Sequence, residues 1–463
     1  MNKKISIVIL AAGKGTRLGV ETPKPLVSFQ QTNLIHQVIT EIIKLKNHAQ
    51  IKLSVILGHQ KEMVQDYLNK NFNDLNLEFV YQDKQLGTGH AVSEFINQTK
   101  SDSDEVMILC ADTPLITKSS LTSLIDFKNN SNLNACGLSF IAKNPQGYGR
   151  IKRVSPDRGI SIIEEKDASA EERKINEVNS GIYLVDQSYL LEKIGKLDNK
   201  NKSGEFYLTD IMGPNDNCGF ITVKNGEDIF LGVNTMTQLE QAEQLARKKM
   251  CEHLQLNGVC IIDSNTTYID NEVKIEPGVK IMPNVHLRGK TIIKKNSCIE
   301  TGCVISDTII GENVKILPYT VLEDSQVLNG ASVGPFARIR PGSQIGEECK
   351  VGNFVETKKS ILKPGAKVSH LSYVGDAEIG QKTNIGCGFI TCNYDGKNKH
   401  QTIIGENCFI GSDSQVIAPV TIGDNCYVAS GSTINSNLND GDFAISRSRQ
   451  VTKEGMAKRF LKK

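Results

Sequence analysis

Three features that would assign many proteins to a class are missing from this 463-residue sequence. The formal net charge is only +2 with 23% charged residues, so no bulk attraction to nucleic acid or to a membrane surface is expected. No apolar run approaches the roughly 20 residues that a membrane-spanning helix needs. The apolar segment Ile5–Leu10 is too short for the core of a secretory signal. These absences predict a protein that binds neither nucleic acid nor membrane.

Paired cysteine spacings are also lacking. Of the 12 cysteines, eight lie at or after Cys260, mostly inside a regular repeat where they replace small apolar residues. The sequence therefore predicts neither a disulfide framework nor a zinc site, and it indicates a protein of the reducing cytoplasm.

What the sequence does contain is a strict period of six residues between about Ile310 and Ile434. One aliphatic residue returns at every sixth position, which neither the helical period of 3.6 nor the strand period of 2 explains. A period of six predicts a solenoid with three flat sides per coil, in which the aliphatic side chains point inward and glycine permits the tight corners. The two longest registers are Val333, Ile339, Ile345 and Val351, and Ile404, Ile410, Val416, Ile422, Val428 and Ile434.

The first half alternates predicted strands and helices, as α/β proteins do. A strand over Ile5–Leu10 runs into a glycine-rich segment that carries Lys14 and Arg17, with Lys24 close behind. A strand, a glycine loop and then a helix present backbone N–H groups to a phosphate. The three cations suit a triphosphate that loses pyrophosphate. The P-loop spacing and the third glycine of the dinucleotide fingerprint are absent. For the glycines alone, a surface turn with solvated charges stays an open alternative.

Asp112 follows the apolar segment Glu105–Cys110, which predicts a central parallel strand. Open α/β sheets bind ligands at the carboxyl ends of such strands, so Asp112 is a candidate ligand of Mg²⁺. A turn or helix N-cap aspartate fits the same position equally well.

Several segments together resemble one family of enzymes. The chain is similar over its whole length to the bacterial bifunctional enzymes that act as N-acetylglucosamine-1-phosphate uridyltransferase and glucosamine-1-phosphate N-acetyltransferase. The resemblance implies an α/β Rossmann-like nucleotidyltransferase domain followed by a left-handed parallel β-helix. It also implies a homotrimer. The segments that carry it, besides the hexapeptide register, are Leu10–Arg17, Lys24–Leu26, Gln85–Ala91, Gly147–Ile151, Glu164 with Lys166, Asn179–Gly181, Glu205–Asp210 and Gly232–Asn234.

For the first half, the resemblance implies transfer of uridylyl from UTP to N-acetylglucosamine 1-phosphate, with release of pyrophosphate. Arg17 and Lys24 would neutralise the phosphates, and Asp112 and Asn234 would bind Mg²⁺. Catalysis would then consist of positioning and charge neutralisation, without a protein nucleophile. The implied residues that bind UTP or the product are Leu10, Ala11, Ala12, Gly13, Lys24, Gln82, Gly87, Thr88, Cys110, Ala111, Asp112, Gly149, Glu164, Asn179 and Asn234.

In the solenoid, chemistry is expected where the register breaks, because loops added to a rigid scaffold commonly carry function. His370 lies at one such break, and its unperturbed pKa near 6.5 suits a general base. A lone histidine is more often a surface residue, but the resemblance places His370 in the acetyltransferase site, with a backbone N–H near Ser412 holding the oxyanion. The implied contacts of glucosamine 1-phosphate are Arg340, Lys358, Tyr373 and Asn384, and those of acetyl-CoA are Cys387, Asn393, Tyr394, Ser412, Ser430 and Arg447.

The sequence departs from the family at two positions. Cys110 stands where relatives often have tyrosine, and Cys387 stands where they commonly have alanine. The first contact is to the backbone, so the change should matter little, whereas a thiol at Cys387 is expected to make the acetyl-CoA site sensitive to alkylation.

The predicted domains are 1–234 for uridyl transfer, a linker helix over 235–256, and 257–463 for acetyl transfer. Two other readings are open at this point. One is a monofunctional sugar nucleotidyltransferase whose solenoid only oligomerises, and the polar loop 391–402 argues against it. The other is a non-catalytic assembly subunit, against which the intact glycine loop, Lys24 and Asp112 argue.

Overall fold

The structure is a computed structural model that describes residues 3–100, 102–153 and 160–461. It divides into two compact units, Met1–Ala246 and Arg247–Lys463. Within the described residues, no helix has both the length and the apolarity needed to cross a bilayer.

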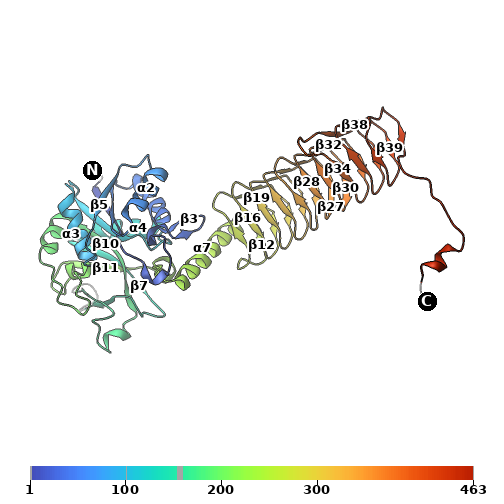
Figure 1. Cartoon of the computed structure of the whole chain (residues 1–463). Helices are drawn as coiled ribbons and strands as arrows, with labels where there is room; N and C mark the ends of the chain where they lie inside the picture. The colour runs from blue at the N-terminus through green and yellow to red at the C-terminus, as the bar shows by residue number, and fades with distance from the viewer. Residues whose placement is uncertain (1–2, 101, 154–159, 462–463) are drawn as a thin grey trace. The chain divides into compact units, whose positions relative to one another are not determined.

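The first unit is built on a mixed sheet with the strand order β11-β7-β10-β6-β1-β4-β5 (Figure 1). β1 pairs in parallel with β4 and β6, while β10 runs antiparallel to β6 and β7. The central strand β6 therefore ends beside β1, as the sequence predicted. The strands are β1 (Lys4–Ala11), β4 (Gln50–Leu57), β5 (Leu77–Tyr81), β6 (Glu105–Cys110), β7 (Ala135–Ile141), β10 (Glu177–Asp186) and β11 (Cys218–Thr222), with β8 (Arg150–Arg153) and β9 (Ile160–Ile163) off the main path.

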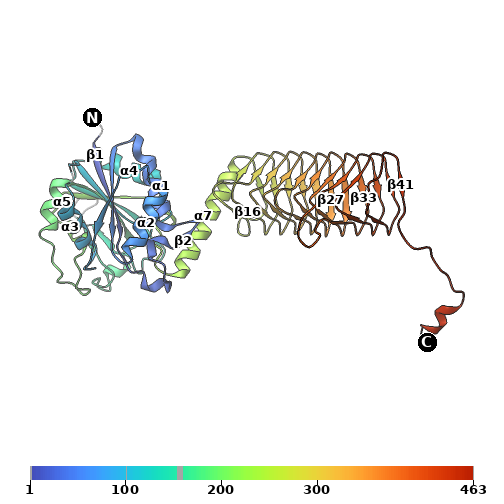
Figure 2. The ribbon, with the colours of Figure 1, turned by 45° about the horizontal axis from the view of Figure 1, so that its top comes forward.

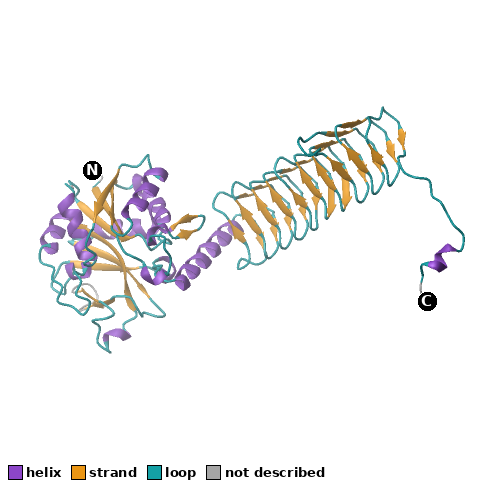
Figure 3. Ribbon diagram, viewed as in Figure 1, coloured by secondary structure: helices purple, strands orange, loops and turns teal. Residues whose placement is uncertain are grey.

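Apolar side chains cover both faces of this sheet, which is why β1 is apolar along its length. Ile7 and Ile9 of β1 belong to the core on one face, and Val8 belongs to the core on the other. Helices lie on both sides of the strands (Figure 3). They are α1 (Leu34–Ile43), α2 (Lys61–Asn71), α3 (Thr88–Gln98), α4 (Lys118–Asn129), α5 (Gln187–Ile194) and the short α6 (Gly226–Ile229), whereas α7 (Met236–Leu256) does not cover the sheet.

The segment after the glycine loop differs from the expectation of a helix directly behind it. Only a 3-10 turn, Thr16–Leu18, follows the loop, and the first α-helix begins at Leu34. Gly15 and Gly19 have left-handed φ angles of 63° and 67° and bound this turn, so a continuous helix cannot form there. The loop thus presents its backbone through a tight turn.

The second unit is a left-handed parallel β-helix with three sheets of 11, 10 and 9 strands (Figure 2). Each strand pairs in parallel with the strand one coil further along, for example Val333 with Val351. The 11-stranded sheet runs from β12 (Cys260–Ile261) to β41 (Phe443–Ala444). The 10-stranded sheet runs from β13 (Tyr268–Ile269) to β40 (Thr433–Ile434), and the 9-stranded sheet from β14 (Lys274–Ile275) to β38 (Val420–Ile422).

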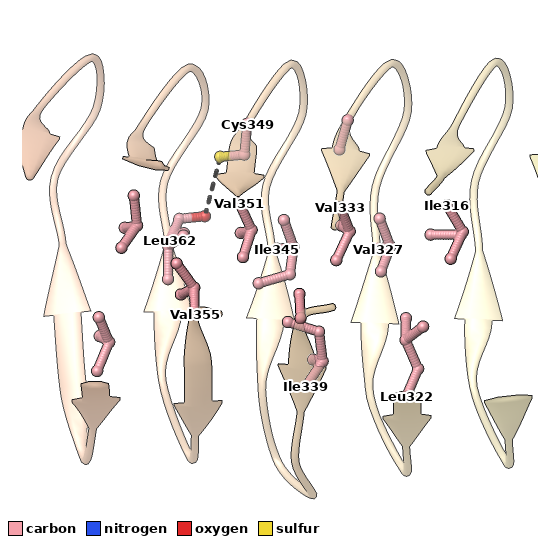
Figure 4. Close-up of a cluster of buried hydrophobic side chains, with 14 of the residues drawn as sticks. Ile316, Leu322, Val327, Val333, Ile339, Ile345, Cys349, Val351, Val355 and Leu362 are labelled. Atoms are coloured by element: carbon pink, nitrogen blue, oxygen red, sulfur yellow. Dashed lines mark hydrogen bonds between the residues drawn. The ribbon is translucent and has the colours of Figure 1, made fainter. Parts of the chain in front are cut away.

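The six-residue register points into the solenoid, as predicted. Val333, Ile339 and Ile345 have no exposed surface, and Cys349, four positions after Ile345, is 1% exposed. Figure 4 shows these side chains stacked in columns along the axis, with the Cys349 thiol directed at the Leu362 carbonyl oxygen. Because each coil covers the aliphatic side chains of the next, the core extends through the whole array.

Two of the glycines that follow inward aliphatic residues serve a different purpose from the one expected, although Gly334 does have a positive φ of 107°. Gly346 and Gly352 do not adopt the left-handed conformation. The residues two positions later do, Glu348 at φ 53° and Phe354 at φ 54°. A Cβ on Gly352 would lie 1.8 Å from the Ser369 carbonyl oxygen of the next coil. Glycine is therefore needed here because adjacent coils approach closely, and the corner itself is made by other residues.

The predicted linker helix is present as α7. Leu239, Ala242 and Ala246 pack in a core cluster of the first unit, together with Leu18. Further along, Met250 packs against the core of the solenoid. The apolar stripe read from the sequence is therefore shared by two cores.

Replacing Gly352 with alanine is expected to destabilise the solenoid by about 3 kcal/mol, the upper end of overpacking, because the Cβ meets a backbone oxygen that cannot rotate away. Thermal unfolding measures the effect. Gly195→Ala is the matched control, because its Cβ would meet no atom closer than 3.9 Å. Equal melting temperatures for the two variants would contradict the close-approach explanation.

Candidate active sites

A cavity of about 330 Å³ opens at the carboxyl ends of β1 and β6 in the first unit. The glycine loop forms one wall, and the segment between β5 and α3 forms another. Most of the residues expected to bind the nucleotide line it, and Pro25, Gln85, Ala91 and Glu205 were not expected. The expected residues that line the cavity are Leu10, Ala11, Ala12, Gly13, Lys24, Gln82, Gly87, Thr88, Cys110, Ala111 and Asp112.

Two side-chain oxygens accept hydrogen bonds from one lysine that lines this cavity. The Lys24 ammonium donates to Asp112 Oδ2 and, over 2.7 Å, to Asn234 Oδ1. Arg17 Nη2 donates to the same Asn234 oxygen over 3.1 Å. A carboxylate and an amide oxygen within reach of one positive charge are a donor set that suits a hard divalent cation. Among the described residues, no group of three or more His, Cys, Asp or Glu side chains is arranged to hold a metal.

The three cations of the glycine loop separate in the structure. Lys24 and Arg17 meet at Asn234, whereas Lys14 is exposed and lines a neighbouring cavity with His59. Sequence spacing alone did not distinguish Lys14 from the other two.

A second group of predicted residues lies beside the cavity without lining it. A Cβ on Gly149 would be 3.5 Å from Glu164 Oε1 and 3.6 Å from Asn179 Cβ, so these three residues are neighbours. Burial raises the pKa of the Glu164 carboxyl, which accepts a hydrogen bond of 3.2 Å from Thr209. The group contains half-buried side chains that can form hydrogen bonds, as a polyhydroxyl ligand requires.

Gln85 is a residue of the cavity that sequence reasoning assigned only to a motif. Its Nε2 donates to the Ala12 carbonyl oxygen over 2.5 Å and so ties the glycine loop to the segment before α3. Its position at the start of the motif Gln85–Ala91 could have indicated a role in the cavity.

In the solenoid, His370 ends β30 (Lys367–His370) at an exposed corner, as expected. Its Nδ1 lies 3.0 Å from Asn353 Oδ1, one coil earlier in the same sheet. An amide oxygen only accepts, so Nδ1 carries the proton and Nε2 keeps the lone pair that a general base needs. Asn353 was missed from the sequence, although it precedes His370 by one coil.

Three cations, Arg340, Lys358 and Lys399, lie close together beside the 10-stranded sheet. Arg340 donates to Glu356 Oε1 over 2.7 Å, and Lys358 lies in β28 (Glu356–Lys358). Contact with the Lys399 side chain lowers the pKa of Lys358. Two adjacent ammonium groups repel each other unless an anion neutralises them, so this arrangement favours a phosphate. Lys399 comes from the polar loop and was not singled out from the sequence.

The polar loop 391–402 is ordered by its own hydrogen bonds. Asn393 Nδ2 donates to Asp376 Oδ2 over 2.5 Å. The backbone of Tyr394 pairs with that of Lys399 in an isolated antiparallel β-bridge. The backbone N–H of Asn398, together with His400, holds the pKa of Asp395 well below its usual range. The Tyr394 side chain is 60% exposed, so its ring is free to meet a ligand or another chain.

Four of the six residues expected to contact acetyl-CoA, Cys387, Ser412, Ser430 and Arg447, follow one corner through successive coils, whereas Asn393 and Tyr394 lie in the polar loop. Asp413 N donates to the Cys387 carbonyl oxygen over 2.7 Å, which sets Cys387 beside Ser412. Gly431 N donates to the Ser412 carbonyl oxygen over 2.8 Å, and Arg447 Nη1 donates to the Ser430 carbonyl oxygen over 2.9 Å. An elongated ligand can therefore run along this corner from His370 towards Arg447.

Asn384 does not join the other residues expected to bind the sugar phosphate. It lies in β33 (Asn384–Ile385) of the 11-stranded sheet, whereas Lys358 and Tyr373 lie in strands of the 10-stranded sheet. Within one chain these side chains project from different faces of the solenoid.

An α/β unit with a cavity of nucleotide size and a hexapeptide solenoid with an exposed corner histidine occur together in one chain. This combination defines a nucleotidyltransferase joined to an acyltransferase. The comparisons with known proteins agree. The family described as nucleotidyl transferase matches residues 6–215, and the bacterial transferase hexapeptide family matches 272–307 and 401–436.

The relatives named "Bifunctional protein GlmU" match along the full length. The protein from Pelobacter propionicus is 40% identical and the alignment covers 100% of both chains. That from Shouchella clausii is 41% identical over 98% of both, and that from Staphylococcus haemolyticus is 42% identical over 98% of this chain and 99% of the relative. The chain belongs to the GlmU family of bifunctional enzymes.

The resemblance noted from the sequence is thereby confirmed, and with it the function. The protein is a transferase with two activities, acetyl transfer to glucosamine 1-phosphate and uridylyl transfer to N-acetylglucosamine 1-phosphate. The monofunctional and non-catalytic readings are both wrong.

Cys110 is expected to resist alkylation although it lines the nucleotide cavity. Burial raises the pKa of its thiol to about 12, so it stays protonated and unreactive at neutral and mildly alkaline pH. Cys260, which is exposed, is the control. Peptide mapping after iodoacetamide at pH 8 should find Cys260 modified and Cys110 unmodified, and the reverse would contradict the burial argument.

Proposed function

We propose that the cavity of the first unit binds UTP, with the triphosphate against the glycine loop and the sugar of the second substrate against Gly149, Glu164 and Asn179. The assignment is carried by the convergence of Lys24, Asp112 and Asn234 at the cavity mouth. Leu10, Ala11, Ala12, Gly13, Gln82, Gly87, Thr88, Cys110 and Ala111 contribute the remaining contacts with the nucleotide.

Asp112 and Asn234 would hold a divalent cation, proposed to be Mg²⁺. Their two oxygens already face a positive charge, and Mg²⁺ commonly takes one or two protein oxygens together with substrate phosphates. When bound, the cation neutralises charge on the triphosphate. The Lys24 ammonium contacts the same two side chains and would lie beside the phosphates that the cation binds.

The residues of this chain then act by positioning and by charge. Lys24 and Arg17 hold the phosphates so that an oxygen of the sugar phosphate attacks the α-phosphorus in line as pyrophosphate leaves. Glu164 and Asn179 fix the sugar and thereby the direction of attack. The attacking oxygen belongs to the sugar phosphate, so the transfer needs no nucleophile from the protein.

In the solenoid, we propose that His370 Nε2 accepts a proton from the amine of glucosamine 1-phosphate, which attacks the thioester carbonyl of acetyl-CoA. The C–S bond then breaks, and CoA leaves as a thiolate that takes up a proton. Asn353 holds the imidazole in the tautomer that this step requires. Arg340, Lys358 and Tyr373, with Lys399 in support, bind the sugar phosphate. The backbone N–H of Ser412 stabilises the oxyanion, and Cys387, Asn393, Tyr394, Ser430 and Arg447 bind acetyl-CoA.

We further propose a homotrimer in which the acetyl-transfer site forms between chains. The placement of Asn384 on a different sheet from Lys358 supports this arrangement, since a second chain can bring the two together. An apolar ridge gives further support. Tyr319, Phe336 and Phe354 stack at 5.3 and 5.5 Å along one corner, and each is about half exposed. A row of aromatic side chains exposed to solvent in this way is typical of a contact between subunits.

The proposed compartment is the cytoplasm. All twelve cysteines within the described residues carry free thiols, which is the state that a reducing compartment maintains. UTP and acetyl-CoA are the proposed small-molecule partners there, and neither nucleic acid nor membrane is a proposed partner.

Reciprocal variants test the assignment of the two sites. Lys24→Ala and Asp112→Ala should each lower kcat/KM for uridylyl transfer by at least about 100-fold, because transition-state charge loses its partner. Acetyl transfer should stay near normal. His370→Ala should do the opposite. Release of pyrophosphate from UTP and of thiol from acetyl-CoA measures the two activities separately, and equal loss of both in one variant would contradict the separation.

Complementation tests the shared site. Lys358→Ala and Asn384→Ala are each expected to lose acetyl transfer when expressed alone, because the two residues lie on different sheets of the solenoid. If the two residues of one site come from different chains, co-expression of both variants restores roughly a quarter of the wild-type sites by random assembly. Each single variant expressed alone gives the baseline activity. Activity that stays at this baseline would place both residues in one chain.

A further inference from the structure

The amide of Gln82 is held in one orientation on the wall of the nucleotide cavity. Gln82 directly follows β5 and is 4% exposed. Its Nε2 lies 3.0 Å from the Gly87 carbonyl oxygen and 3.0 Å from His90 Nδ1. An amide nitrogen has two protons, and these two acceptors use both. The atom left for a ligand in the cavity is therefore the acceptor Oε1.

This orientation depends on which nitrogen of His90 carries the proton. His90 belongs to α3, and its Nε2 lies 3.3 Å from Glu94 Oε1, one helical turn further on. An ionised carboxylate only accepts, so it favours the proton on Nε2 and leaves the Nδ1 lone pair to accept from Gln82. Gln98 Nε2 donates to the other carboxylate oxygen of Glu94 over 2.7 Å and holds it in place. Glu94, His90 and Gln82 thus form a directed chain of hydrogen bonds.

We propose that Glu94 and His90 are positioning residues that make this enzyme select uracil over cytosine. They do so by fixing the Gln82 amide with its oxygen towards the base. Uracil carries a proton on N3 and can donate to that oxygen, whereas the N3 of cytosine is an unprotonated acceptor. With cytosine, the acceptor Oε1 of Gln82 would face the acceptor N3, and both buried atoms would lack a hydrogen-bond partner. Such a mismatch strongly disfavours cytosine relative to uracil. The inference rests on the proposed binding of UTP in this cavity.

The chain of hydrogen bonds is needed because the two ends of a glutamine amide have nearly the same shape. Without an acceptor at His90 Nδ1, the amide can rotate and present its nitrogen to the base, which suits the N3 of cytosine. Gly87 alone would not prevent the rotation with the same strength, because only one of two hydrogen bonds would remain.

The test is the ratio of kcat/KM for UTP to that for CTP in the nucleotidyl-transfer reaction. His90→Phe keeps a ring of similar shape beside Phe206, whose ring centre is 6.5 Å away, but removes the acceptor. The ratio should fall by at least about tenfold, the size of one hydrogen bond. Glu94→Lys, which donates to Nε2 and reverses the tautomer, should lower the ratio too. Glu94→Gln can still accept from Nε2 and is the matched control that should retain it.

Thermal unfolding and circular dichroism of the same preparations report folding of the first unit and should be unchanged in every variant. An unchanged ratio in His90→Phe and Glu94→Lys overturns the proposal, as does an equal loss of rate with both nucleotides, which would indicate a purely structural role. Gln82→Ala separates the two levels of inference. If it alters the ratio while the His90 and Glu94 variants do not, only the positioning chain is wrong. If it changes neither the rate nor KM for either nucleotide, the cavity does not bind the base.

Discussion

The solenoid depends on one constraint, that the aliphatic side chains of each coil are covered only by those of the neighbouring coils. Successive backbones must therefore stack at the spacing of parallel strands, which leaves no room for a Cβ at Gly352. Stacking also aligns equivalent positions into columns. The proposed acetyl-transfer site uses such a column, because His370, Cys387, Ser412 and Ser430 follow one corner from coil to coil. The packing that stabilises the fold thus also arranges its chemistry.

The first unit gathers its chemistry in another way. Parallel strands of a sheet bring their carboxyl ends to one edge, so the glycine loop after β1 meets Asp112 after β6. Asn234 arrives from a distant part of the chain and shares the Lys24 ammonium with Asp112. Both units therefore hold clusters of charged groups at fixed positions. The first unit does so at the edge of a sheet, and the solenoid does so at its stacked corners. This independence is consistent with two activities in one chain.

Much of this was predictable where a local pattern has a single physical explanation. The six-residue period predicts that Val333, Ile339 and Ile345 point inward from the three sides of a coil, because only a solenoid returns a side chain to its core at that interval. The strand before Asp112 is recognisable because burial on both faces demands an unbroken apolar run. Most residues of the nucleotide cavity were predicted from the resemblance to the enzyme family. Asn234, a plain loop residue in isolation, had no local signal at all.

By itself, the sequence determined the two architectures, the family and the general position of each site, since these follow from periodicity and from motifs contiguous in the chain. Only the tertiary structure decided which side chains meet. It separated Lys14 from Lys24, set Asn353 on the imidazole of His370, brought Lys399 against Lys358 and linked Glu94 through His90 to Gln82. The physical reason is that hydrogen bonds and charge contacts depend on distances of a few ångströms. Those distances are set when separate segments pack, and no pattern within one segment records them.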